Sequence, residues 1–266
     1  MRPTVESIPA PRDWWRPLRY LWRAPQLLLH ALVAFPLALI AFSPLGRGVR
    51  VRGERLDYTM TRWWSGRIVR IFGFRISRTG EALPGAVLFV ANHVSWLDIE
   101  LMHSQRIMSF VAKAEIERWP LVGWLATRAG TIYHRRGSGH SLNAVMQRVV
   151  ECLRRGMAVG VFPEGGAGPG DRVRTFHARI FQVAVDAQVP IQPVALCYGN
   201  GGHMDLRVPF APDENFFANF MRLLGEPGRD AQVRFLESMP AHGDGRRQIA
   251  EGARAAIAQA LGCAPE

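Results

Sequence analysis

The segment AVLFVANHVSWLD, residues 86–98, joins an apolar run to a group of polar side chains. Its first six residues are all apolar, which is typical of a strand that is buried on both faces of a sheet. Asn92, His93 and Asp98 follow that predicted strand. In open α/β sheets, functional sites lie outside the carboxyl ends of the strands. The segment therefore predicts an α/β fold and the place of its chemistry.

Similar apolar runs recur along the chain and alternate with helical patterns. Strands are predicted at residues 107–112, 130–133, 157–162, 191–196 and 232–236, and helices at 141–155, 176–187, 213–224 and 245–261. This alternation predicts a mixed α/β sheet flanked by helices.

An apolar segment precedes this α/β region. No charged residue lies between residues 24 and 46, and the run LLLHALVAFPLALIAF spans residues 27–42. About 20 such residues in a helix can cross a ~30 Å hydrocarbon core. Pro25, Pro36 and Pro44 could instead kink the segment into a shallow or re-entrant hairpin, and a buried core helix is the remaining alternative. A membrane-associated helical segment is the favoured interpretation.

Residues 56–74 interleave tryptophan and aliphatic side chains with arginines. The pattern is that of an amphipathic helix on an anionic membrane surface, or of an ordinary surface helix of the folded domain. We expect two domains, membrane-anchoring helices over residues 1–75 and an α/β domain over residues 76–266.

The net charge indicates which class of binding partner the protein has. The 266 residues carry a formal net charge of +11, which calls for an anionic partner. The apolar segment favours an anionic membrane over nucleic acid, for which there is no recognition motif. The three cysteines form no close pair that would indicate a disulfide framework or zinc. We expect an inner-membrane protein whose α/β domain faces the reducing cytoplasm.

His93 and Asp98 are candidates for acid–base chemistry. If a helix begins at Ser95, Asp98 can accept the imidazole N–H, and the other ring nitrogen can take a proton from a hydroxyl. The alternative is structural, because Ser95-x-x-Asp98 is also a capping-box pattern in which Asp98 only caps the helix.

Three further segments accompany this pair, namely GTIYHRR at residues 130–136, VFPEGG at 161–166 and VPIQPV at 189–194. Together with the Asn92–Asp98 segment, they resemble the four motifs of the glycerolipid acyltransferase family, best known for its lysophosphatidic acid acyltransferases. The matching residues are Asn92, His93 and Asp98; Gly130, Ile132, Tyr133 and Arg136; Phe162, Pro163, Glu164 and Gly165; and Val189, Pro190, Ile191 and Pro193.

The resemblance implies a role for each site residue. His93 would be the general base that activates the acceptor hydroxyl, and Asp98 would orient it. Arg136 would bind the acidic headgroup of the acceptor, while Glu164 and Gly165 would shape the acceptor site. Lys113 would add to a positive headgroup pocket, or it is simply a solvated lysine at a strand end.

One departure from the family pattern concerns the acceptor. The third motif continues with threonine and arginine, where this chain has Gly166 and Ala167. Either Arg172 or Arg174 takes the place of the missing arginine, or the acceptor carries another headgroup, as in lyso-ornithine lipid or another lysophospholipid.

The resemblance implies transfer of a fatty acyl group from acyl carrier protein or coenzyme A to the sn-2 hydroxyl of lysophosphatidic acid, giving phosphatidic acid. The acyl thioester is a co-substrate, and we expect no cofactor and no metal. A serine hydrolase is disfavoured because no G-x-S-x-G motif follows a predicted strand. The non-enzymatic alternative is a membrane scaffold that binds lipid.

Overall fold

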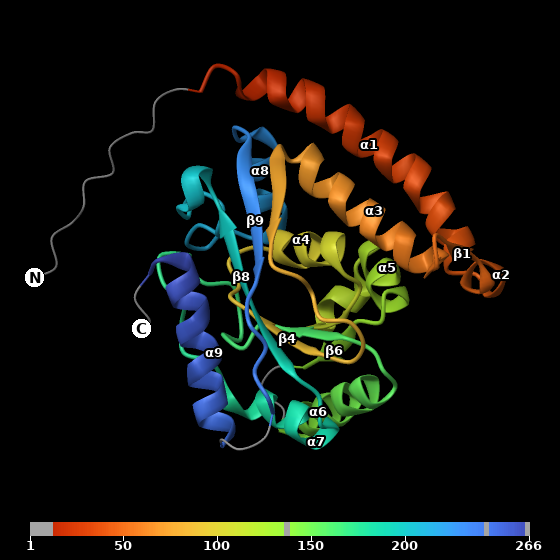
Figure 1. Cartoon of the computed structure of the whole chain (residues 1–266). Helices are drawn as coiled ribbons and strands as arrows, with labels where there is room; N and C mark the ends of the chain where they lie inside the picture. Colours follow the sequence, from red (N-terminus) through yellow and green to blue (C-terminus); the bar gives the residue numbers. More distant parts are fainter. Residues whose placement is uncertain (1–12, 136–138, 242–244, 264–266) are drawn as a thin grey trace, which may run out of the picture.

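The computed structural model describes residues 13–135, 139–241 and 245–263. A seven-stranded sheet with the order β3-β9-β8-β4-β7-β5-β6 forms its centre (Figure 1). The strands span Phe74–Thr79 (β3), Leu88–Ala91 (β4), Ser109–Lys113 (β5), Ile132–His134 (β6), Val159–Val161 (β7), Ile191–Tyr198 (β8) and Arg229–Phe235 (β9). The predicted mixed sheet is confirmed.

The direction of the strands decides where their ends meet. β8, β4, β7, β5 and β6 run parallel to one another. β9 is antiparallel to β8 and pairs in parallel with the edge strand β3. The carboxyl ends of β4, β7, β5 and β6 therefore share one edge of the sheet, and the loops that follow them are brought together there.

Helices cover both faces of the sheet. The helices of the described residues are α1 (Arg16–Ala41), α2 (Pro44–Gly48), α3 (Leu56–Ile71), α4 (Leu97–Gln105), α5 (Val122–Arg128), α6 (Gly139–Arg154), α7 (Gln182–Ala187), α8 (Phe216–Gly225) and α9 (Arg246–Leu261), of which α1 and α2 pack on other helices. The 3₁₀ turns are η1 (Ala114–Arg118), η2 (Ala178–Phe181) and η3 (Asn200–Gly202).

Two hydrophobic cores lie on opposite faces of the sheet. Phe89 and Ala91 of β4 join the core made with α3, α4 and α8, whereas Leu88 and Val90 join the core made with α6, α7 and α9. All four side chains are fully buried. The unbroken apolar run of β4 is explained by this double coverage, since successive side chains of a strand point to opposite faces.

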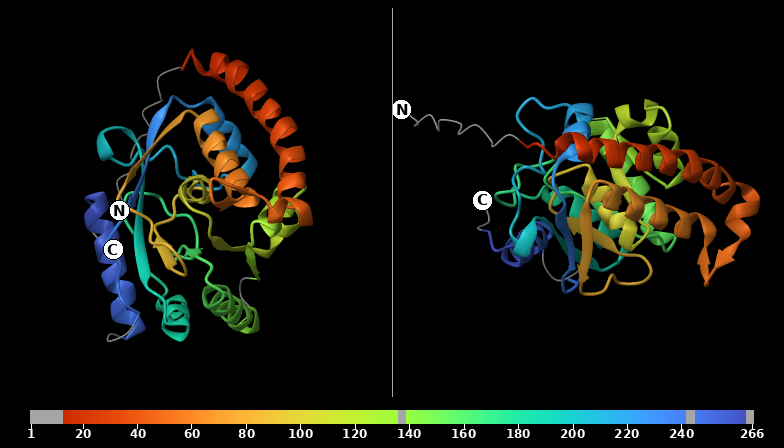
Figure 2. Two further views of the ribbon diagram at one scale, coloured as in Figure 1. Left: turned by 45° about the vertical axis from the view of Figure 1, so that its right-hand side comes forward. Right: turned by 90° about the horizontal axis from the view of Figure 1, so that it is seen from above.

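The N-terminal apolar segment is one continuous helix. α1 passes through Pro25 and Pro36 without a break, so it does not form a hairpin. It lies along α3 and α8, across one side of the molecule (Figures 1 and 2). Within the described ranges, α1 alone is long and apolar enough to cross a membrane, and only 22% of its most apolar window is buried. It is therefore not a core helix.

The two faces of α1 differ in character. The inner face has small side chains, Ala34, Ala38 and Ala41, which are buried against the neighbouring helices. The outer face exposes large apolar side chains, namely Leu18, Leu21, Trp22, Leu28, Leu29, Leu32, Val33, Leu37, Leu39 and Ile40. A continuous apolar surface of this kind marks a contact with a membrane or another protein.

Arginines fasten α1 to the rest of the molecule. Arg23 is buried and donates hydrogen bonds to the carbonyls of Leu224 (2.9 Å) and Glu226 (2.7 Å). Arg19 donates to the carbonyl of Gly225 at 2.6 Å. These carbonyls end α8 and have no partner within their own helix, so arginine is well suited to bind them.

Several elements escaped the sequence analysis, among them α2, α5 and the three strands before β4. Residues 50–55 form a small hairpin of β1 (Arg50–Val51) and β2 (Glu54–Arg55). β3 begins at Phe74, beside the expected domain boundary at residue 75, and it is an edge strand with few buried side chains. The predicted helix at residues 56–74 is α3, which packs between α1 and α4 and exposes Arg62, Trp63, Arg67 and Arg70. The division into two domains stays a prediction.

Candidate active site

The turn between β4 and α4 brings His93 and Asp98 together. His93 Nδ1 lies 2.7 Å from Asp98 Oδ2. The same oxygen accepts the backbone N–H groups of Val94 (2.8 Å) and Ser95 (2.9 Å), just before α4 begins at Leu97. Asp98 thus caps the turn and also contacts the imidazole, so the geometry agrees with the structural and with the chemical interpretation, and the catalytic role of the pair stays a prediction.

The surroundings of His93 leave one ring nitrogen for chemistry. The imidazole stacks on the ring of Phe162, with 4.2 Å between the ring centroids and 18° between the planes. Its side chain is 18% exposed, whereas that of Asp98 is completely buried. Because Nδ1 is held by Asp98, Nε2 is the nitrogen that can accept a proton from a substrate.

Glu164 links the loop after β7 to the β4–α4 turn. Its Oε1 accepts the backbone N–H of His93 at 2.9 Å, and its Oε2 accepts Nε of Arg174 at 3.1 Å. Burial raises the pKa of this carboxyl, while the hydrogen bonds from His93 and Arg174 oppose that rise. Both oxygens are therefore engaged within the protein, and Glu164 joins the loop after β7 to the β4–α4 turn.

Further contacts hold the loop of residues 162–174 in place. Gly168 donates its backbone N–H to the carbonyl of His93 at 2.6 Å, and Arg174 donates to the carbonyl of Gly166. Gly165 has a positive φ of 76°, and a Cβ there would lie 3.0 Å from Nε2 of His177. Both features favour glycine at residue 165.

The cationic residues lie along the neighbouring strand ends. Lys113 ends β5, is exposed, and pairs in register with His134 at the end of β6. Arg135 follows directly and is also exposed. Arg136, the predicted headgroup ligand, lies outside the described residues. Two arginines were considered as replacements in the third motif. Arg174 contacts Glu164 of that motif, whereas Nε of Arg172 lies 3.8 Å from Oδ1 of Asp171.

Sequence reasoning missed Tyr198 at the end of β8. Its hydroxyl donates to Asp98 Oδ1 at 2.7 Å, and the side chain is completely buried. The sequence signal for Tyr198 was its position close to the end of a predicted strand. That strand is β8, which lies beside β4, and a polar group at its carboxyl end faces the same edge of the sheet as the end of β4.

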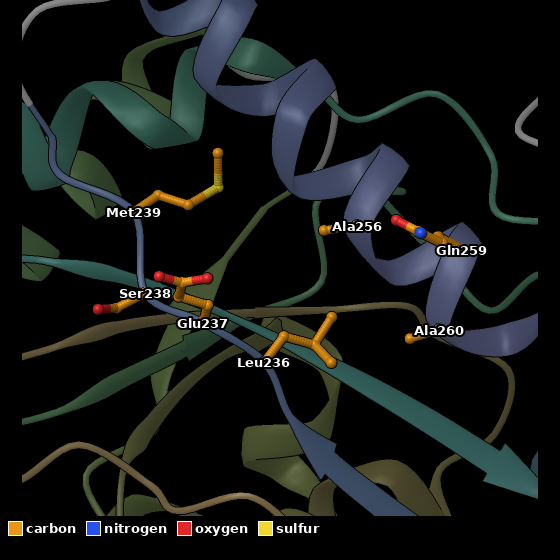
Figure 3. Close-up of a pocket in the computed structure, with 7 residues that line it drawn as sticks. All are labelled: Leu236, Glu237, Ser238, Met239, Ala256, Gln259 and Ala260. Atoms are coloured by element: carbon orange, nitrogen blue, oxygen red, sulfur yellow. The ribbon is translucent and has the colours of Figure 1, made fainter.

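A cavity elsewhere in the described part of the chain lacks this combination of groups. This open cavity of about 540 Å³ lies between residues 236–239 and α9, and its lining includes none of the predicted site residues (Figure 3). Within the described part of the chain, no group of three or more His, Cys, Asp or Glu side chains is arranged to hold a metal ion.

Comparison with known proteins matches the motif-bearing region and most of the chain. The acyltransferase family model matches residues 75–197. A lyso-ornithine lipid O-acyltransferase from Pseudomonas aeruginosa is 41% identical over 250 residues, which cover 92% of this chain and 94% of that protein. A 1-acyl-sn-glycerol-3-phosphate acyltransferase from Neisseria gonorrhoeae is 40% identical over 126 residues, covering 47% of this chain and 49% of that protein.

The fold is also that of a solved structure. The crystal structure of the 1-acyl-sn-glycerophosphate acyltransferase from Thermotoga maritima superposes with a TM-score of 0.62 over 90% of this chain and 96% of that one, at 20% identity. The resemblance read from the four motifs is confirmed, and the chain belongs to the acyltransferase family.

Proposed function

We propose that this protein transfers a fatty acyl group from a thioester of acyl carrier protein or coenzyme A to the free hydroxyl of a lysolipid, with His93 as general base. The observation that carries the proposal is the 2.7 Å contact between His93 Nδ1 and Asp98 Oδ2, at the strand edge of a chain that belongs to the acyltransferase family.

The reaction follows from this geometry. Asp98 fixes the proton on Nδ1, and Nε2 takes the hydroxyl proton of the acceptor as its oxygen attacks the thioester carbonyl. A carbon–oxygen bond forms, the carbon–sulfur bond breaks, and the departing thiolate recovers the proton from the imidazolium. The buried carboxylate stabilises the transient imidazolium. No covalent enzyme intermediate is required, and the thioester supplies the driving force without a cofactor.

The proposed acceptor is lyso-ornithine lipid. Gly166 and Ala167 stand where the family's third motif has threonine and arginine. The lyso-ornithine lipid O-acyltransferase from Pseudomonas aeruginosa matches nearly the whole chain. The 1-acyl-sn-glycerol-3-phosphate acyltransferase from Neisseria gonorrhoeae matches about half of it. The headgroup site would contain Lys113, Arg136 and Arg174. Lysophosphatidic acid is the second candidate, because cationic side chains also suit a phosphate.

Attachment to the membrane completes the proposal. The outer face of α1 would enter the bilayer, and the exposed arginines of α3 would contact anionic headgroups of the inner membrane. The α/β domain would then face the cytoplasm, where acyl thioesters are available. The alternative is a membrane scaffold that binds lipid without turnover. Measured acyl transfer would exclude it.

The test is an acyl-transfer assay on isolated membranes with a labelled acyl thioester. The acceptors are lyso-ornithine lipid, lysophosphatidic acid and lysophosphatidylglycerol. We expect the highest kcat/KM with lyso-ornithine lipid. The double variant Gly166→Thr/Ala167→Arg restores the family sequence, and it should shift the preference towards lysophosphatidic acid by about tenfold, the value of one charge-assisted hydrogen bond.

The backbone can accept these changes, since φ of Gly166 is not positive. The control is Arg148→Ala on the outer surface of α6, which should leave the preference unchanged. A wild type that prefers lysophosphatidic acid would replace the proposed acceptor and keep the reaction. Failure to acylate any lysolipid would refute acyl transfer itself.

A further inference from the structure

The phenol of Tyr198 contacts the side of Asp98 that faces away from His93. We propose that Tyr198 is a positioning residue for acyl transfer, because its O–H holds Asp98 Oδ1 so that Oδ2 stays directed at His93 Nδ1. The inference rests on the proposed role of His93 as base and assigns a function to a residue outside the four motifs.

The two oxygens of Asp98 divide their contacts unequally. Oδ2 accepts three N–H groups, from the ring of His93 and the backbones of Val94 and Ser95. Among the described residues, Oδ1 has one hydrogen-bond partner, the hydroxyl of Tyr198 at 2.7 Å. The phenol therefore supplies the contact that fixes the rotation of the carboxylate on the Oδ1 side.

The core fixes the position of the phenol. Phe74 of β3 packs its ring against that of Tyr198, with 5.5 Å between the centroids and 74° between the planes. Asn92 also locks the end of β4 to β8, since its side chain donates to the carbonyl of Leu196 (2.9 Å) and accepts the N–H of the same residue (2.8 Å). Tyr198 lies two residues beyond this clamp, so the distance between the phenol and the turn is set by the sheet.

The phenol stays a donor throughout the neutral range. Burial raises its pKa well above the ordinary value, and the neighbouring Asp98 carboxylate raises it further. Tyr198 therefore keeps its proton and can always donate a hydrogen bond to Asp98 Oδ1. The arrangement is a buried row of phenol, carboxylate and imidazole, of which only His93 reaches the solvent.

Loss of the hydroxyl should have two effects on catalysis. The carboxylate loses a hydrogen bond to a charged group, so the imidazole is less well oriented and kcat should fall about 10- to 100-fold with KM unchanged. The hydrogen bond from the phenol also no longer offsets part of the negative charge of Asp98. The carboxylate then stabilises the imidazolium more strongly, and the acid limb of the kcat/KM profile should move to higher pH.

The experiment compares Tyr198→Phe with wild type in kcat, in KM for both substrates and in the pH profile of kcat/KM, using the full chain in detergent. Phe235→Leu is the matched control, because it loosens the same hydrophobic core at the contact with Phe89 and leaves Phe74, Tyr198 and the hydroxyl in place. It should lower the thermal unfolding temperature without moving the acid limb. His93→Ala is measured in parallel.

The outcomes separate the two hypotheses. A lower kcat and a shifted acid limb in Tyr198→Phe alone support the positioning role. Equal pH profiles in Tyr198→Phe and wild type overturn it, as does an identical shift in Phe235→Leu. If His93→Ala retains full turnover, the proposed function itself has failed.

Discussion

The β4–α4 turn and helix α1 use buried polar groups for different ends. In the turn, Asp98, Tyr198 and the backbone of two residues direct one imidazole, and each contact fixes an orientation. In α1, Arg19 and Arg23 bind carbonyls at the end of α8, and these contacts hold in place a helix whose outer face is apolar. The residues that orient His93 and those that hold α1 are therefore separate groups. A single substitution in one group should leave the function of the other group unchanged.

The largest effect is expected at the turn. His93→Ala removes the base, which contributes on the order of 10²–10⁴-fold or more to turnover, while the packing of the fold is retained. Acyl transfer and vesicle binding of the variant should be measured side by side, with the exposed His203→Ala as control. The comparison predicts lost turnover with unchanged vesicle binding. Turnover close to that of wild type would remove His93 from the mechanism.

An intermediate effect is expected at the outer face of α1. Replacing Leu28, Leu29 and Leu32 by serine removes exposed apolar groups, at about 1 kcal/mol or more for each leucine that enters the bilayer. Partition into vesicles should fall on the order of 100-fold, whereas turnover in detergent micelles should be preserved. Leu206→Ser, an exposed leucine outside α1, is the control. Unchanged partition of the triple variant would mean that another surface binds the membrane.

The smallest effect is expected where α1 meets the body. Arg23→Ala leaves the carbonyls of Leu224 and Glu226 without their donor, at a cost of about 1–3 kcal/mol. Thermal unfolding in detergent should show the loss, with Arg67→Ala on the exposed side of α3 as control. The kcat of the folded fraction should be that of wild type. A variant as stable as wild type would show that apolar packing alone holds α1.

Local sequence patterns predicted the parts that depend on neighbouring residues. The apolar run of β4 and the polar residues after it placed His93 and Asp98 correctly, because strand, turn and helix start are contiguous. β3 was missed because FRISRT alternates weakly and exposes most of its side chains at the sheet edge, where only pairing with β9 makes it a strand. The sequence left a straight helix and a kinked hairpin both open for α1, and the structure shows the straight helix, which packs against α3 and α8.

The sequence by itself determined the α/β class, the apolar N-terminal helix, the His93–Asp98 pair and the family to which the motifs point. Only the tertiary structure decided that Glu164 ties two loops together, that Arg174 reaches the third motif, and that Tyr198 completes the contacts of Asp98. These residues stand 71, 10 and 100 positions from their respective partners. Hydrophobic periodicity and capping act over a few residues. The contacts of Glu164 with His93 and of Tyr198 with Asp98 exist because the parallel strands bring their carboxyl ends to one edge, whereas the contact of Arg174 with Glu164 depends on how the loop after β7 folds back.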